Sequence, residues 1–194
     1  MQYRIEKNRL FDILSIWDGF LKRKVHLVAC GGTALTLLEL KESTKDIDFL
    51  VPEKAEYSYL IATLENLGYE QKTGYGWSKD DGFIFELFPG NAIFTTILVE
   101  SPLKENNNIM VKEFNYIYVG ILNYYDLLIS KLFRSTAVDR DDCLMLVKAK
   151  HKEINFNKLR DRFYETPSYD ISDEKNRRNF EDFLKLLKRD GIKI

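Results

Sequence analysis

Two short runs in the first quarter of the chain carry residue types suited to chemistry, and the more informative is Asp46-Ile47-Asp48. Side chains alternate along a β-strand, so Asp46 and Asp48 share one face and Ile47 takes the other. Their Cα atoms would then lie about 6–7 Å apart, which lets both carboxylates bind one divalent ion or a pair of ions. Ligand sets made only of oxygen favour Mg²⁺ or Mn²⁺ over zinc.

The other run is Gly31-Gly32-Thr33, which follows a short apolar segment and precedes a helical pattern. A double glycine lets the backbone turn tightly and approach a ligand closely. The first amides of the following helix could then hold a phosphate group, and Thr33 adds a hydroxyl at the same place. These residues are therefore predicted to be able to hold a phosphate group.

A site for two metal ions needs a third carboxylate, and Glu86 is the best candidate. It lies in the apolar run Phe83–Phe88, where it shares a strand face with Ile84 and Phe88. An acid on an apolar strand face is costly unless it is paired or bound to a metal. Glu86 is therefore preferred to Asp80 and Asp81, which belong to a predicted turn.

Each of these signals is weak when it is taken alone. Two glycines after a strand often form only a tight turn, and an Asp-x-Asp run is often a solvated strand edge. The ordered set of strand, glycines, helix, paired aspartates and a later acidic strand is much less expected by chance. We therefore interpret the set as one site.

The hydrophobic pattern predicts an α/β chain of α+β type: a mixed sheet with flanking helices, followed by a helical segment. We expect an α/β core over residues 1–122 and a helical subdomain packed on it over residues 123–194. Expected helices cover 3–23, 33–41, 53–67, 123–132, 137–150, 156–165 and 173–190, and expected strands cover 25–30, 46–51 and 83–88.

Composition excludes several classes of protein. The 194 residues carry 29 Lys and Arg against 30 Asp and Glu, so the net charge of −1 does not suit binding to nucleic acid by bulk charge. Hydrophobic residues make up 45%, too many for a disordered chain. We see no apolar run of membrane-spanning length and no secretion signal, and two cysteines are too few for a disulfide scaffold. A cytoplasmic protein with no membrane partner is expected.

The spacing from Gly31-Gly32 to Asp46-Ile47-Asp48 resembles the signature of the polymerase-β-like nucleotidyltransferase superfamily. The run Gly31-Gly32-Thr33-Ala34-Leu35 is most similar to small prokaryotic members of the AbiEii toxin type. The resemblance implies transfer of a nucleoside monophosphate from a nucleoside triphosphate to an acceptor hydroxyl on an RNA or tRNA end, a protein or a small molecule. It also implies Mg²⁺ or Mn²⁺ on Asp46, Asp48 and Glu86, with the glycines against the triphosphate.

The same resemblance extends to a downstream helix. It implies that Lys131 contacts nucleotide phosphate and that Asp139 supports catalysis, and it suggests a toxin with a cognate antitoxin protein as partner. Two positions depart from the family pattern, because Glu42 and Val138 stand where basic residues are common. They leave open an alternative: a non-catalytic binding module of the same fold, or the antitoxin partner of another protein.

Overall fold

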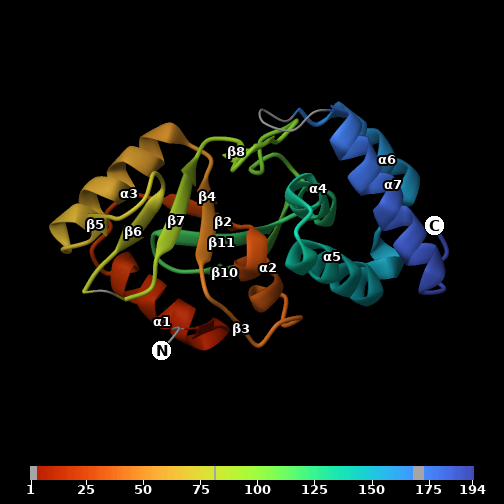
Figure 1. Ribbon diagram of the computed structural model, residues 1–194. Coiled ribbons are helices and arrows are strands. Elements are labelled where there is room, and N and C mark those ends of the chain that lie inside the picture. The colour runs from red at the N-terminus through yellow and green to blue at the C-terminus, as the bar shows by residue number, and fades with distance from the viewer. Residues whose placement is uncertain (1–3, 81, 168–172) are drawn as a thin grey trace. The chain divides into compact units, whose positions relative to one another are not determined.

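The computed structural model describes residues 4–80, 82–167 and 173–194 (Figure 1). The chain divides into two compact units. The first unit comprises Met1–Asn91 and Glu100–Leu122, and the second comprises Ala92–Val99 and Asn123–Ile194. The expected α/β fold class is confirmed, since the chain combines a mixed sheet with helices.

A seven-stranded sheet with strand order β10-β11-β2-β4-β7-β6-β5 forms the centre of the first unit (Figure 1). The pairs β11–β2 and β4–β7 are parallel and the remaining pairs are antiparallel. The strand bounds are β2 (Val25–Ala29), β4 (Ile47–Val51), β5 (Glu70–Gln71), β6 (Gly76–Ser78), β7 (Phe85–Pro89), β10 (Asn108–Glu113) and β11 (Ile117–Leu122). A two-stranded sheet joins β1 (Ile5–Glu6) to β3 (Ser43–Thr44).

Three helices accompany this sheet: α1 (Lys7–Asp18), α2 (Gly31–Leu37) and α3 (Lys54–Asn66). All five residues of β4 are buried, as a strand in the middle of a covered sheet requires. At the end of α1, the carboxylate of Asp18 accepts the backbone N–H groups of Tyr116 and Ile117 at 2.7 and 2.9 Å, which fixes the start of β11.

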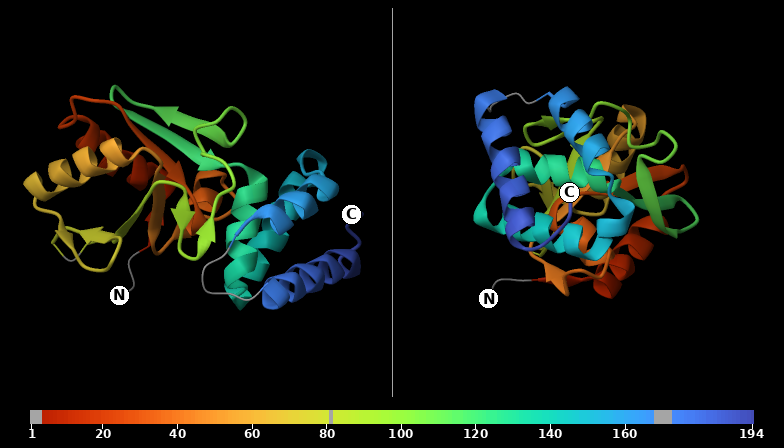
Figure 2. Two further views of the ribbon diagram at one scale, coloured as in Figure 1. Left: turned by 90° about the horizontal axis from the view of Figure 1, so that it is seen from above. Right: turned by 90° about the vertical axis from the view of Figure 1, so that its right-hand side faces the viewer.

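The second unit is mainly helical (Figure 2). Its helices are α4 (Tyr124–Arg134), α5 (Ala137–Lys150), the short 3₁₀ helix η1 (His151–Glu153), α6 (Phe156–Glu165) and α7 (Asp173–Arg189), and a small hairpin pairs β8 (Ala92–Ile93) with β9 (Thr96–Ile97). The helices α5, α6 and α7 all pack against α4. The expected cap of α4 is present, because the Asn123 side chain accepts the backbone N–H of Asp126 at 3.0 Å.

The helices of the described residues do not include one that is both long and apolar enough to cross a lipid bilayer. The longest of them, α7, is strongly amphipathic, with Phe180, Phe183 and Leu187 buried on one face.

The expected turn at Asp81-Gly82 lies partly outside the described residues, because Asp81 is not among them.

Candidate active site

Asp48 and Glu86 are neighbours across two parallel strands. The register of β4 and β7 places Asp48 opposite Glu86, with the pairs Ile47–Phe85 and Phe49–Leu87 on either side. Side chains at paired positions of a sheet point to the same face, so the two carboxylates lie on one face about 4.8 Å apart in strand spacing. The adjacent pairs turn their apolar side chains to the other face. An acidic pair is thus held on a buried apolar frame.

Two glycines lie next to this acidic pair, one beside each carboxylate. The register of β6 and β7 places Gly76 opposite Glu86, so no side chain larger than hydrogen flanks Glu86 from that strand. On α2, a Cβ built on Gly31 would lie 2.2 Å from Oδ2 of Asp48. Gly31 also has a φ of +57°, in the left-handed region that favours glycine. Only glycine lets the start of α2 come so close to the Asp48 carboxylate.

Hydroxyl groups fix the backbone around the two aspartates. The Thr33 hydroxyl accepts the backbone N–H of Asp48 at 2.9 Å and donates to the carbonyl oxygen of Asp46 at 3.2 Å. The Thr44 hydroxyl donates to the same carbonyl oxygen at 3.0 Å. The backbone carbonyl of Asp46 therefore receives two hydrogen bonds, while its side chain is exposed. Thr33 is fully buried, and its hydroxyl links α2 to the start of β4 through these two hydrogen bonds.

The strand expected over 46–51 begins one residue later than predicted, at Ile47. The two aspartates therefore differ in their exposure to solvent. Asp46 precedes β4 and is exposed, whereas Asp48 lies within the strand and is 7% exposed. Within the described residues, no group of three or more His, Cys, Asp or Glu side chains is placed to hold a metal ion. The carboxylates of Asp48 and Glu86 are oxygen donors of the kind that Mg²⁺ prefers, and the lack of a side chain at Gly31 makes room for the Asp48 carboxylate.

Lys131 and Asp139 belong to a different cluster, inside the helical unit. Nζ of Lys131 lies 2.7 Å from Oδ2 of Asp142 and 3.7 Å from Oδ1 of Asp139, and the lysine is only 2% exposed. Arg134 donates to Oδ1 of Asp139 at 2.6 Å. The cluster joins the end of α4 to the start of α5. Its charges are engaged with one another, as buried ions require.

Asp139 also caps α5. Its Oδ2 accepts the Thr136 hydroxyl at 2.8 Å, while the Thr136 hydroxyl oxygen accepts the Asp139 backbone N–H at 3.1 Å. Burial alone would raise the pKa of Asp139, but the hydrogen bond and charge of Arg134, together with Thr136 and Lys131, lower this pKa below its usual value. Asp139 is therefore held as a carboxylate.

Several residues that build these sites were not among the predicted site residues. Thr44 fixes Asp46, and Arg134 binds Asp139; both depend on partners whose proximity only the fold provides. Arg162 is similar, since its Nε and Nη2 bind the two carboxylate oxygens of Asp126 at 2.7 Å each across 36 residues. Gly76 opposite Glu86 was likewise not predicted.

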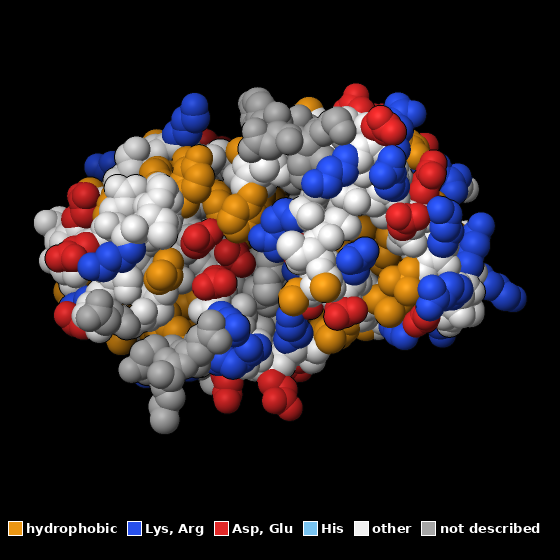
Figure 3. Space-filling model, in the orientation of Figure 1, with side chains coloured by type: hydrophobic (Ala, Val, Ile, Leu, Met, Phe, Trp, Pro, Cys, Tyr) orange, Lys and Arg blue, Asp and Glu red, His pale blue; other side chains and the backbone are white. Residues whose placement is uncertain are grey.

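Acidic side chains gather over β4 and β7 on the face shown in Figure 3. The chain belongs to the family described as "Nucleotidyltransferase of unknown function (DUF6036)", whose model matches residues 8–190. The prediction of an enzyme of the nucleotidyltransferase class is thereby confirmed.

Two solved structures show the same fold. ANT(2″)-Ia in complex with adenylyl-2″-tobramycin is 14% identical, with a TM-score of 0.55, over 81% of this chain and 95% of that chain. An antigenic nucleotidyltransferase-like protein from Paracoccidioides brasiliensis is 12% identical, with a TM-score of 0.51, over 96% of this chain and 91% of that chain. No curated protein matches the chain.

Proposed function

We propose that this protein is a Mg²⁺- or Mn²⁺-dependent nucleotidyltransferase that moves a nucleoside monophosphate from a nucleoside triphosphate to an acceptor hydroxyl. The observation that carries the proposal is the parallel register that pairs Asp48 with Glu86 beside Gly31. Like charges on neighbouring strands favour a bound cation. Family membership makes nucleotidyl transfer the reaction for which such a cation would serve.

In the proposed reaction, Asp48 and Glu86 would hold the metal ion, and the exposed carboxylate of Asp46 would be a further ligand from the residue before β4. When bound, the metal offsets the negative charge that develops around the α-phosphate as pyrophosphate leaves. The acceptor oxygen forms its bond to the α-phosphorus as the bond to pyrophosphate breaks. Glu86 accepts the proton of the acceptor hydroxyl, and the backbone at Gly31 and Gly32 lies against the triphosphate.

For Lys131 and Asp139 we propose a supporting role in place of direct contact with nucleotide. Lys131 is buried and bound to Asp142, so a contact with phosphate would require this ion pair to break. Both residues hold the junction of α4 and α5.

The non-catalytic alternative has one observation in its favour. Among the residues that the structure describes, no group of three or more His, Cys, Asp or Glu side chains is placed to hold a metal ion. The alternative predicts a chain that binds nucleotide weakly or not at all and transfers none.

A transfer assay tests the proposal. The protein is incubated with Mg²⁺, each α-labelled nucleoside triphosphate, and total RNA, cell protein or small-molecule extract as acceptor. We expect label to move with the wild type and transfer to fall at least a hundredfold in Asp48→Asn, because the amide keeps the shape but loses the charge. Asp12→Asn, an exposed carboxylate on α1, is the matched control and should transfer normally.

Full activity in Asp48→Asn would refute the site, and failure of the wild type to transfer label to any acceptor would favour the binding module. The acceptor that takes the label identifies the substrate class. If the protein is a toxin, its expression should arrest growth, and Asp48→Asn should remove that effect.

A further inference from the structure

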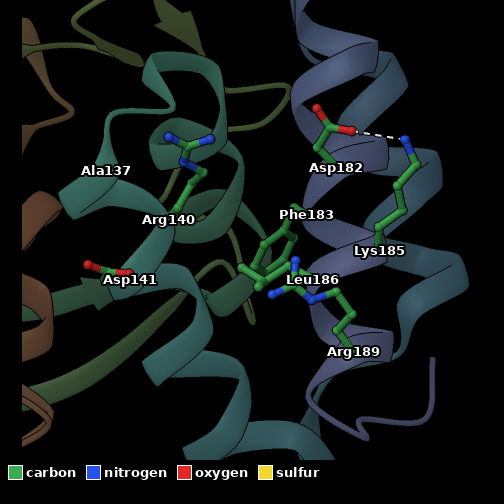
Figure 4. Close-up of a pocket in the computed structure, with 8 residues that line it drawn as sticks. All are labelled: Ala137, Arg140, Asp141, Asp182, Phe183, Lys185, Leu186 and Arg189. Carbon is green, nitrogen blue, oxygen red and sulfur yellow. Dashed lines mark hydrogen bonds and ion pairs between the residues drawn. The ribbon is translucent and has the colours of Figure 1, made fainter.

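The hollow between α5 and α7 in the helical unit shows no preference for one class of ligand (Figure 4). Its volume is about 440 Å³, and its apolar floor includes Phe183, which is 1% exposed and belongs to the core. Its rim carries both signs of charge, from Arg140, Arg189, Asp141 and Asp182. The surface beside the acidic pair of the sheet is different, because its side chains are of one kind.

Apolar and neutral side chains border Glu86 on the sides away from β4. Phe88 follows Glu86 by two residues in β7, so both side chains face the same side of the sheet, with Cα atoms about 6–7 Å apart. Gly76 lies opposite Glu86, and the side chains of Ile84 and Thr73 fill the space that a side chain at Gly76 would need. A molecule that reaches the Glu86 carboxylate therefore passes groups without charge.

Tyr75 adds an exposed aromatic ring to this border. Its ring centroid lies 5.2 Å from that of Phe88, with an angle of 51° between the planes. Phe88 is 1% exposed and Tyr75 is 46% exposed, so Phe88 supports the ring from within while much of the ring meets solvent. The backbone N–H of Leu87 donates to the carbonyl oxygen of Tyr75 at 2.9 Å, which holds the residue against β7. A held and open aromatic ring is a surface on which a flat group can stack.

We propose that Tyr75 binds the acceptor of nucleotidyl transfer, and that this acceptor is a small-molecule alcohol whose hydroxyl lies close to a flat ring. The inference rests on the proposed function, in which Glu86 accepts the proton of the acceptor hydroxyl. The flat ring, aromatic or sugar, would stack on Tyr75 while the hydroxyl reaches Glu86. Tyr75 would select the acceptor and take no part in the proton transfer.

An RNA end fits this surface less well. The side chains that border Glu86 carry no positive charge: they are Ile84, Phe88, Thr73 and Tyr75. The lysine beside Thr73, Lys72, is paired with Glu70 at 2.7 Å. RNA binding depends on basic contacts to phosphates, and the carboxylate of Asp48 would repel them. An uncharged or cationic small molecule avoids both difficulties.

Saturation-transfer difference NMR tests the proposal with named probes. The full chain is mixed with Mg²⁺, a non-hydrolysable nucleoside triphosphate analogue and one of three alcohols: benzyl alcohol, methyl β-D-glucopyranoside or 1-pentanol. The first two carry an aromatic ring and a sugar ring, and the third has no ring. We expect at least one ring probe to give a stronger signal than 1-pentanol. Tyr75→Ala should reduce that signal at least fivefold, and Tyr75→Phe should keep it.

Tyr116→Ala is the matched control, because Tyr116 is also exposed, at 38%, and lies in the turn before β11. It should leave the signals within twofold of the wild type. Mn²⁺ affinity should be unchanged in Tyr75→Ala and reduced in Asp48→Asn, so a failure of the acceptor surface can be distinguished from a failure of the metal site. Circular dichroism melting verifies that each variant is folded.

The proposal would be overturned if neither ring probe exceeded 1-pentanol, or if the ring signals were the same in Tyr75→Ala. A Tyr75-dependent affinity for hexa-adenylate RNA that exceeds the affinity for both ring probes would overturn it in favour of an RNA end. In the transfer assay, label should enter the small-molecule fraction, and Tyr75→Ala should raise the KM of that acceptor at least tenfold with kcat within threefold. Label on RNA or protein would contradict the proposal.

Discussion

Asp48 and Gly31 depend on each other at the scale of single residues. The carboxylate occupies the space where any larger residue at position 31 would place its Cβ. This close approach brings the backbone of α2 near the Asp48 carboxylate, and in the proposed site it would bring the first backbone amides of α2 near a bound metal ion. The sequence contains both residues, and their spacing correctly placed them on adjoining elements. What the spacing left undetermined is which of the two aspartates is buried.

Gly31→Ala tests this dependence. The new methyl group would lie 2.2 Å from Oδ2 of Asp48, and φ would stay near +57°. We expect a loss of about 1–3 kcal/mol in the free energy of unfolding from backbone strain, together with loss of transfer as Asp48 moves. Urea unfolding and the transfer assay measure the two effects.

Gly74→Ala is the matched control, because nothing lies within 4 Å of a Cβ at that position. It should keep activity and change stability by less than about 1 kcal/mol. A fully active and stable Gly31→Ala variant would show that the close approach to Asp48 has no role.

Among the elements, the junction of α4 and α5 combines a helix cap with a buried ion cluster. Thr136 and Asp139 form a capping box, and Arg134 binds the same carboxylate. Positions 137–150 were predicted as a helix from the sequence pattern, and α5 has these bounds. The burial of Lys131 could not be predicted, because a lysine on an amphipathic helix normally faces water.

Asp139→Asn tests the electrostatic part of this junction. The Asp139 pKa is lower in the folded protein than its usual value of 3.8, so its charge stabilises the fold above that pH. This contribution is lost as the pH falls below about 3.8 and through the lower folded pKa. We expect the variant to be less stable at pH 7 by about 1–3 kcal/mol, because Arg134 loses its charged partner.

The variant should also lose less stability than the wild type below pH 4. Urea unfolding at several pH values measures both effects, with the exposed Asp161→Asn on α6 as control. An identical pH dependence in wild type and Asp139→Asn would contradict the proposed role of the cluster.

At the scale of the whole molecule, the alternation of helical and strand patterns was sufficient to predict the fold class. Residues 156–165 show why, since a strongly amphipathic segment after Asn155 became α6 with these bounds. Residues 92–99 show the limit: this apolar stretch groups with the helical unit through long-range contacts, such as the backbone N–H of Ile97 with the carbonyl oxygen of Pro167. Strand pairing between β4 and β7 is equally non-local.

The central claim is that Asp48 and Glu86 bind the divalent ion that serves nucleotidyl transfer, and Mn²⁺ binding tests it most directly without knowledge of the acceptor. Electron paramagnetic resonance of free Mn²⁺ would be recorded during titration of the full chain with a non-hydrolysable nucleoside triphosphate analogue present. We predict that the wild type and Asp12→Asn bind Mn²⁺, and that Asp48→Asn and Glu86→Gln bind it at least tenfold more weakly. Equal Mn²⁺ affinity in all four proteins would contradict the account.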